Sequence, residues 1–240
     1  KEKVMGKGYY AGIDSGSTST DVVILDKNRE IISSVIMPTG AGAANGAERA
    51  LEEALKQAKL NREDLDAVRQ LRQKTDMFFD CHVMVENQDF FVDELLDIGV
   101  QQIVFHAETQ PHIDGMINRI HAKGVKAGIA LKPSTPLSTV EYVLDKCDSV
   151  LLMLINPGYA FLKGEKQVAY ADRKIRQLRQ MINERGLDTK IELDGRISPD
   201  NIRTYGKDLA DVFVTGTTCL DRNDLSGSFA RLEQLRREIL

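Results

Sequence analysis

Cysteine is scarce in this chain of 240 residues, and no hydrophobic run is long. Cys81, Cys147 and Cys219 are odd in number, widely spaced and set among apolar residues. This pattern argues against a disulfide framework and against a cysteine-rich metal site, and we interpret all three as buried thiols. The apolar runs fall well short of the ~18 residues that a membrane-spanning helix needs.

An excess of charge of one sign is also lacking. The formal net charge is -4, with acidic and basic residues interspersed, which gives no broad basic face for nucleic acid and no polybasic anchor for a membrane. The opening segment KEKVMGKGYY has no hydrophobic core of the signal-peptide kind. We therefore expect a cytoplasmic protein that binds a small neutral or anionic ligand.

From residue 77 onward, short apolar runs alternate with segments of helical spacing. The six runs are MFFDCHVMV, QIVFHAE, VKAGIALKP, SVLLMLINPG, TKIELDG and DVFVTGT. They lack polar alternation, as parallel strands buried on both faces do. The segments expected to be helical are QDFFVDELLDIG, PHIDGMINRIHAKG, TPLSTVEYVLDKC, KQVAYADRKIRQLRQMINERG and SPDNIRTYGKD. The sequence thus predicts an α/β, barrel-like fold of six parallel βα units, two short of a closed barrel.

The N-terminal segment has a different pattern. YYAGIDSGSTSTDVVILDKNREIISSVIMP predicts an antiparallel hairpin or three-stranded segment, with DKNRE as a hairpin loop. A helix is expected over residues 47–59. We place the junction between residues 64 and 75 and expect residues 1–66 and 67–240 to form one merged domain.

An open sheet of six strands exposes unpaired backbone groups at its edges. We therefore expect the N-terminal strands to pair with the parallel sheet and complete the barrel, with the helix over residues 47–59 packed outside it. Dimerisation through a remaining edge, which would give a homo-oligomer, is the alternative.

Six blocks in the second part of the chain carry a family resemblance. DCHVMVEN, FHAET, VKAGIALKPSTPLSTVEYVL, INPGY, IELDGRISPDNI and ADVFVTGT, in this order, resemble the ribulose-phosphate 3-epimerases, including their allulose-6-phosphate relatives. The resemblance implies proton abstraction beside a ketose carbonyl, assisted by a divalent metal such as zinc, iron or manganese, with two aspartates as acid and base. It also implies a small sugar phosphate as the substrate.

Several residues acquire roles from this resemblance. Asp194 in IELDG would be a catalytic aspartate and a metal ligand, and His82 in DCHVM would be another metal ligand. Met84 and Met153 would line the pocket, and His106 would lie near the reacting end. Apolar filling is the alternative for these pocket residues, and a satisfied, partly buried imidazole is the alternative for His82.

Glycine turns after the late strands predict a phosphate site, because backbone N–H groups in such turns form a cradle for a dianion. The matching positions are Gly158, Gly195, Arg196, Gly216 and Thr217. Arg196 replaces the second glycine of the family's DGG motif, and it either reinforces phosphate binding or blocks the backbone approach. Inorganic phosphate or sulfate would bind at the same turns. The alternative is that these glycines only turn the chain.

The part of the sequence that resembles the family has no counterpart of the family's first two barrel strands. One of them carries the His and Asp that supply two metal ligands and the other catalytic aspartate. No His precedes His82, so the missing imidazole has not moved upstream. We expect an incomplete metal site, and phosphate binding that survives better than catalysis unless Asp14 or another carboxylate substitutes.

A second resemblance covers the N-terminal segment. GIDSGSTSTDVVILD, SSVIMPTGAG and ALEEALKQAKLNREDLD resemble the ATPase activators of 2-hydroxyacyl-CoA dehydratases, in the acetate kinase, sugar kinase, Hsp70 and actin superfamily. In that family the turn at Asp14, Ser15, Gly16, Ser17 and Thr18 would wrap ATP phosphates and magnesium. The second lobe and the cluster cysteines of the family do not follow, so a plain hairpin turn is the preferred interpretation.

Two unrelated fragments that meet near Asp66 indicate a recombined or engineered chain. Three hypotheses follow for its function. The first is an epimerase-like sugar-phosphate isomerase site with impaired catalysis. The others are a non-catalytic fold chimera and a fragment that binds ATP phosphates through DSGSTST.

Overall fold

A computed structural model gives the structure of the chain. The residues that it describes are 10–15, 19–25, 31–38, 49, 53, 67–86, 88–159, 162, 164–221 and 223–239. The chain divides into two compact units, one made of residues 1–79 with 85–100 and the other of residues 80–84 with 101–240. None of the helices in the described ranges is both long and apolar enough to cross a membrane.

The first unit contains a small antiparallel sheet. Its strands are β1 (Tyr10–Ser15), β2 (Ser19–Leu25) and β3 (Ile31–Pro38), in the order β1-β2-β3. Antiparallel pairing of both neighbours confirms the expected hairpin segment, and DKNRE falls between β2 and β3. Two helices, α2 (Ala67–Arg72) and α3 (Gln88–Ile98), belong to the same unit.

The expectation that these strands complete the parallel sheet is wrong for the described strands, because β1, β2 and β3 pair only with one another. Short turns bring sequence neighbours together at a smaller loss of chain entropy than pairing with a distant edge requires. The predicted helix over residues 47–59 lies outside the described residues except for Arg49 and Glu53, which are helical.

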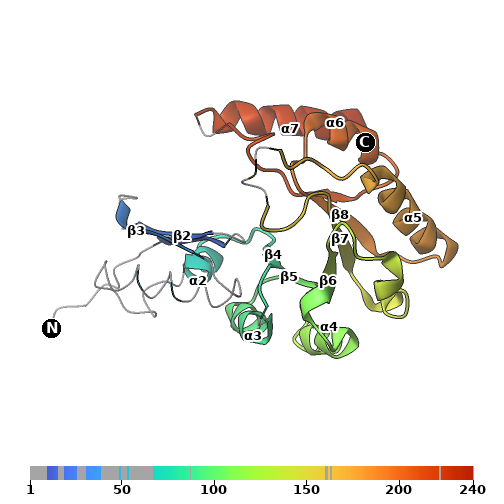
Figure 1. Cartoon of the computed structure of the whole chain (residues 1–240), viewed down its shortest axis with the longest axis horizontal. Coiled ribbons are helices and arrows are strands. Elements are labelled where there is room, and N and C mark those ends of the chain that lie inside the picture. The colour runs from blue at the N-terminus through green and yellow to red at the C-terminus, as the bar shows by residue number, and fades with distance from the viewer. Residues whose placement is uncertain are drawn as a thin grey trace. The chain divides into compact units, whose positions relative to one another are not determined.

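The second unit is built on a six-stranded parallel sheet in chain order. The strands are β4 (Asp80–Val83), β5 (Gln102–His106), β6 (Lys126–Leu131), β7 (Ser149–Met153), β8 (Lys190–Asp194) and β9 (Val212–Phe213). All six predicted strands are confirmed. The sheet curls into a half-barrel, and α4 and α5 lie on its convex side (Figure 1).

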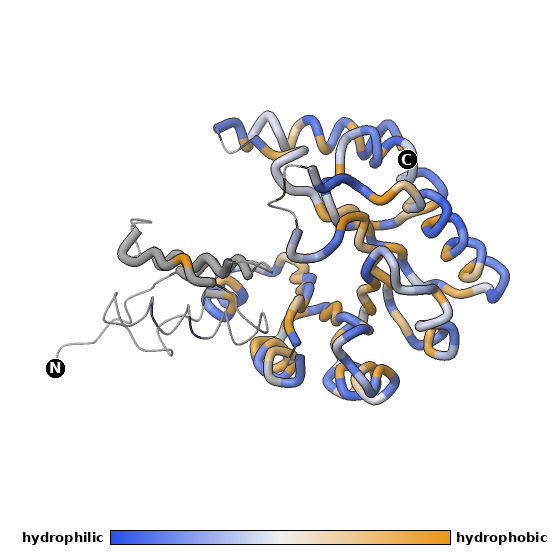
Figure 2. The backbone as a smooth tube through the Cα atoms, viewed as in Figure 1, coloured by the Kyte–Doolittle hydropathy of each residue, from blue (hydrophilic) through white to orange (hydrophobic). Residues whose placement is uncertain are grey.

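Both faces of this sheet are buried along its central strands. On one face, Val104, Ala130, Leu151 and Met153 form a single core cluster. On β5 the alternate residues Ile103 and Phe105 point to the opposite face and are equally buried. Hydrophobic residues gather on the strands, and hydrophilic residues cover the outer sides of the helices (Figure 2). This double burial explains why the strands lack polar alternation.

The connecting helices follow the predicted order with two differences, one additional helix and one predicted helix that does not form. They are α4 (Ile113–His121), α5 (Ala171–Glu184), α6 (Pro199–Tyr205) and α7 (Leu225–Ile239), the last not among the segments named from the sequence. TPLSTVEYVLDKC does not form the expected α-helix. It forms two 3-10 turns, η3 (Leu137–Val140) and η4 (Leu144–Lys146). Its β-branched Thr139, Val140 and Val143 lower its helix propensity, and short 3-10 segments are common connectors.

Two aspartates fix neighbouring strands in the same way. Asp148 precedes β7, and its carboxylate accepts the backbone N–H of Ala127 on β6 at 2.9 Å, while its own N–H donates to the Ala127 carbonyl at 3.0 Å. Asp211 precedes β9 and makes the same pair of bonds to Ile191 on β8, each of 2.9 Å. Each aspartate thus adds a side-chain bond to the start of a strand pair.

Candidate functional site

Two histidines and an aspartate meet at the carboxyl end of the parallel sheet. His82 lies on β4, and His106 and Asp194 are the last residues of β5 and β8. Nε2 of His82 lies 3.0 Å from Nε2 of His106, and the two rings are stacked with centroids 5.0 Å apart. Nδ1 of His82 lies 3.6 Å from Oδ2 of Asp194. Because β4 and β8 are not neighbours in the sheet, this approach occurs across its concave face.

A carboxylate missed in the sequence reading holds His106 in place. Oε2 of Glu108, in the 3-10 turn η2 (Ala107–Thr109), lies 2.9 Å from Nδ1 of His106. Oε1 of Glu108 accepts the backbone N–H of Lys132 at 2.7 Å and the hydroxyl of Thr135. Burial raises the pKa of Glu108, but these hydrogen bonds outweigh it and hold the pKa at about 2. Glu108 is therefore an anion at neutral pH.

Burial determines the charge state of His106. Its residue surface is only 3 % exposed, and the loss of solvation lowers its pKa. The bond to Glu108 opposes this shift, whereas the neighbouring His82 lowers the pKa further. With its pKa below the ordinary value for histidine, the His106 ring is neutral at neutral pH.

The loop after β6 is held from its other side by a buried lysine. Lys174 on α5 donates to the carbonyl of Lys132 at 2.7 Å and to the carbonyl of Pro133 at 3.0 Å. Burial lowers the pKa of Lys174 to about 8. One residue, Lys132, thus has its N–H bound to Glu108 and its carbonyl bound to Lys174.

A second polar cluster lies at the opposite end of the strands. Asp80, Gln102 and Ser149 are the first residues of β4, β5 and β7, and Nε2 of Gln102 donates to Oε1 of Glu192 on β8 at 2.6 Å. Glu192 is 1 % exposed, and its Oε2 has no hydrogen-bond partner in the described part of the chain. Burial and then the Asp80 carboxylate raise the pKa of Glu192 to about 7. This buried acid was also missed from the sequence.

The side chains of His82 and Asp194 are of the types that bind divalent metals, but they are fewer than the ligands that such a site needs. The imidazole of His82 and the carboxylate of Asp194 are ligand types that zinc, iron and manganese accept. No group of three or more His, Cys, Asp or Glu side chains suited to one ion occurs within the described residues. With two such ligands among the described residues, no chemical step is assigned to a metal here.

The predicted phosphate turns follow three neighbouring strands, β7, β8 and β9. Gly158 and Gly195 have positive φ angles of 81° and 112°. A Cβ on Gly195 would lie 2.9 Å from the backbone nitrogen of Ile155, so only glycine fits there without movement. Gln167, which the sequence reading missed, donates to the carbonyl of Gly195 at 2.9 Å.

Arg196 and the last turn lie in different surroundings. Arg196 has a φ of 52°, and its Nη2 donates to the carbonyl of Leu162 at 3.2 Å. Gly216 has open space where a Cβ would lie. Phosphate binding at these turns stays a prediction.

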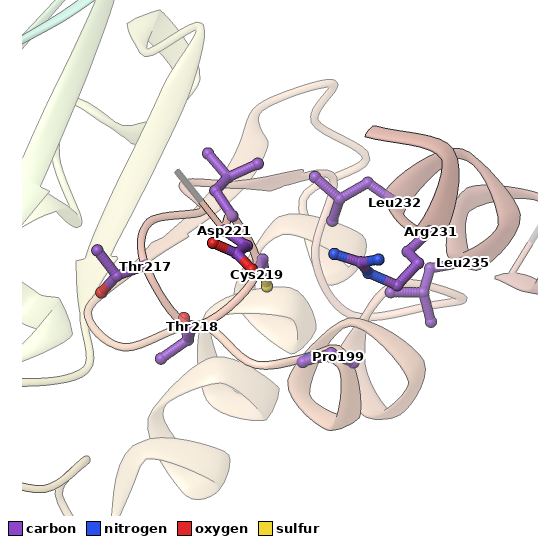
Figure 3. Close-up of a pocket in the computed structure, with 9 residues that line it drawn as sticks. Pro199, Thr217, Thr218, Cys219, Asp221, Arg231, Leu232 and Leu235 are labelled. Carbon is purple, nitrogen blue, oxygen red and sulfur yellow. The ribbon is translucent and has the colours of Figure 1, made fainter. Parts of the chain in front are cut away.

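A hollow of about 190 Å³ lies beside the last turn (Figure 3). Its lining residues are Pro199, Thr217, Thr218, Cys219, Leu220, Asp221, Arg231, Leu232 and Leu235. Of the predicted phosphate residues, only Thr217 lines this hollow. The guanidinium of the lining residue Arg231 is bound within the chain, with Nη1 3.3 Å from Oδ2 of Asp224.

The remaining predicted residues fall into two groups. Met153 is 5 % exposed within the core cluster, and Met84, directly after β4, is 47 % exposed. Asp14 and Ser15 belong to β1, whereas residues 16–18 of the predicted ATP turn lie outside the described residues.

The residues that the sequence reading missed lie inside the motifs that it quoted. Glu108 is the acid of FHAET, two positions after His106, and Thr135 is the threonine of KPST. The spacing of His106 and Glu108 at a strand end was the available signal. A carboxylate that near in sequence can reach back to the ring of the histidine.

Comparison with protein families gives two matches. A family model described as the ribulose-phosphate 3 epimerase family matches residues 62–220. A model described as the hydantoinase/oxoprolinase N-terminal region matches residues 10–71. This second match falls on the segment whose motif resembles the acetate kinase, sugar kinase, Hsp70 and actin superfamily.

Curated relatives extend the first match. The ribulose-phosphate 3-epimerase of Escherichia coli K12 is 37% identical over 145 residues, which cover 60% of this chain and 63% of the relative. The enzyme of that name from Synechocystis is 35% identical over 175 residues, which cover 72% of this chain and 74% of the relative. The chain thus spans less than two thirds of the length of the first relative.

Solved structures show the same fold. A structure titled KGPDC from Streptococcus mutans has a TM-score of 0.56 and 10% identity, over 78% of this chain and 82% of that chain. The 3-hexulose-6-phosphate synthase from Salmonella typhimurium has a TM-score of 0.54 and 17% identity, over 75% and 82% of the two chains. At these identities the likeness concerns the fold alone. Since the family model covers more than half of the sequence, the chain belongs to the ribulose-phosphate 3-epimerase family.

Proposed function

We propose that this chain is a sugar-phosphate-binding, epimerase-like isomerase scaffold in which phosphate binding is retained and epimerisation is impaired. The observation that carries the proposal is the meeting of His82 and Asp194, whose Nδ1 and Oδ2 atoms lie 3.6 Å apart at the carboxyl end of the sheet. The family membership gives this pair its meaning, since active sites of barrel folds assemble at that end.

Impaired epimerisation follows from what surrounds this pair. Inversion at a carbon beside a carbonyl needs one acid–base group on each face of the substrate. Asp194 provides one such group. The family's other catalytic aspartate belongs to one of the two strands that have no counterpart in the resemblance, which is the basis for the expected impairment.

Retained phosphate binding rests on the turns after β7, β8 and β9. These strands are neighbours in the sheet, so the three turns follow one another at its carboxyl end, where barrel folds bind phosphate. Gln167 supports the middle turn by binding the carbonyl of Gly195 at 2.9 Å. The ligand class would be a ketose phosphate or inorganic phosphate.

Calorimetric titration with D-ribulose 5-phosphate and with inorganic phosphate tests the binding half of the proposal. We expect both to bind. A 3-epimerisation assay with added zinc, iron(II) or manganese tests the other half, and we expect turnover far below that of a complete family member. Absence of phosphate binding would contradict retained recognition, and full turnover would contradict impairment.

Asp194→Asn tests the assignment of the acid–base residue. Any residual turnover should fall in this variant and persist in Asp145→Asn, which changes an exposed aspartate in η4. Equal turnover in both variants would remove Asp194 from the proposal. A chain that neither binds the ligands nor turns them over would favour the alternative of a non-catalytic chimera.

A further inference from the structure

We propose that Glu108 is a positioning residue that sets the tautomers of His106 and His82, so that the Nδ1 lone pair of His82 faces Asp194. The inference rests on the proposed function in one respect. His82 and Asp194 matter to it because they belong to the proposed site. The hydrogen bonds that carry it do not depend on a substrate or a metal.

The first step concerns the direction of the hydrogen bonds at Glu108. A carboxylate only accepts hydrogen bonds, and the three donors around Glu108 keep it ionised. The backbone N–H of Lys132 cannot reverse its role, so Oε1 of Glu108 always faces a donor, at 2.7 Å. Oε2, at 2.9 Å from His106, therefore accepts a hydrogen that Nδ1 of His106 must carry.

The second step shows how the tautomer of His106 determines the tautomer of His82. A neutral imidazole has one N–H and one lone pair, so His106 with a hydrogen on Nδ1 has its lone pair on Nε2. Nε2 of His82 lies 3.0 Å from that atom and must be the donor. His82 thus carries its hydrogen on Nε2 and its lone pair on Nδ1.

The third step gives the consequence for the site. Nδ1 of His82 is the atom 3.6 Å from Oδ2 of Asp194. In this tautomer His82 places no hydrogen toward Asp194, and Oδ2 of Asp194 stays free of a hydrogen bond from this ring. In the other tautomer Nδ1–H would point at Asp194 and occupy one of its acceptor positions. Partners of a histidine's second nitrogen commonly fix its tautomer in this way.

Glu108→Gln provides a sharp test because an amide has one acceptor and one donor end. The N–H of Lys132 and the hydroxyl of Thr135 direct the amide oxygen to the Oε1 position. The amide NH₂ then faces His106 and forces its Nδ1 to accept. We expect both rings to change tautomer, which places the hydrogen of His106 on Nε2 and that of His82 on Nδ1.

The readout is two-bond ¹H–¹⁵N NMR of protein labelled with ¹⁵N-histidine, without substrate or metal. The spectra are recorded at about pH 8.5, two units above the ordinary histidine pKa of about 6.5. Glu141→Gln, at an exposed glutamate paired with Arg185, is the matched control and should keep the wild-type tautomers. Assignment of the rings uses single His82→Gln and His106→Gln variants.

Two results would overturn the inference. One is a wild-type spectrum in which His82 carries its hydrogen on Nδ1. The other is a folded Glu108→Gln protein that keeps the wild-type tautomers. The wild-type result stands even where the variant does not fold. Because no ligand is present, failed sugar-phosphate binding would contradict the proposed function and leave this result unchanged.

Discussion

Nε2 of Gln102 donates to Oε1 of Glu192 at 2.6 Å, deep in the parallel sheet and at the end opposite the histidine pair. The bond satisfies one oxygen of a carboxyl group that is 1 % exposed. Burial and the nearby Asp80 carboxylate raise the pKa of Glu192 from 4.5 to about 7. The folded protein therefore binds a proton that the unfolded chain releases at lower pH.

This linkage predicts a fall in stability as pH rises. The favourable contribution of Glu192 is complete below about pH 4.5 and is lost as pH rises to about 7, because the charged form is costly in the folded state. Urea denaturation across this window should show the fall in wild type and a weaker fall in Glu192→Gln. Glu184→Gln, at an exposed glutamate of α5, should retain the wild-type slope. Equal slopes in all three proteins would refute the linkage.

Substitution of two glycines by alanine should change the stability of the protein in opposite directions, one in the turn after β8 and the other in α4. Gly195→Ala should lower the free energy of unfolding by about 1–3 kcal/mol, because φ is 112° and the added Cβ would meet the backbone of Ile155. Gly115→Ala, inside α4 with its nearest contact at 3.8 Å, should raise it by about 0.5–1 kcal/mol. Chemical denaturation measures both. An unchanged midpoint for Gly195→Ala would mean that this turn relaxes freely.

Removal of the buried ammonium should cost stability. Lys174→Met leaves the carbonyls of Lys132 and Pro133 without their donor, and a buried acceptor left unpaired costs about 1–3 kcal/mol. Thermal and urea unfolding should show this loss. Lys123→Met, at an exposed lysine after α4, should stay within about 0.5 kcal/mol of wild type. Similar stabilities of the two variants would indicate that water replaces the lost donor.

The two aspartates before β7 and β9 make a matched pair. Asp148→Ala leaves the N–H of Ala127 without its side-chain acceptor, and Asp211→Ala does the same to Ile191. We expect each to lower the free energy of unfolding by about 1–2 kcal/mol. Each aspartate also has a side-chain partner, His121 at 2.8 Å for Asp148 and Arg179 at 2.6 Å for Asp211, so we expect losses of similar size. Native-state hydrogen exchange at Ala127 and Ile191 should rise in the respective variants.

Much of the parallel sheet was predictable from sequence, because strands buried on both faces consist of dense apolar runs such as SVLLM and KIELD. The capping box of Ser198 and Asn201 at the start of α6 likewise follows from local sequence. The prediction of a helix over TPLSTVEYVLDKC was wrong, because its apolar spacing matched a helix while its β-branched residues disfavoured one. The pairing of the N-terminal strands failed because pattern gives a strand but not its partner.

The site was predictable only where a motif carried it. His82, His106 and Asp194 were named from the family resemblance, and the structure brings them together. Glu108 was not named although it lies two residues after His106, and Lys174 was not named because its partners are the backbone carbonyls of Lys132 and Pro133. Backbone partners leave no mark in residue identity, so such bonds appear only once the chain is folded.

Lys132 is held by two hydrogen bonds, one from its N–H to Glu108 and one to its carbonyl from Lys174. Its peptide groups connect a helix, a loop and a pair of aromatic rings through hydrogen bonds. A ligand that displaced this loop would remove two hydrogen-bond donors from Glu108, the Lys132 N–H and the Thr135 hydroxyl. The support of the histidine pair at the carboxyl end of the sheet would then depend on a loop that touches neither ring in the hydrogen bonds described above.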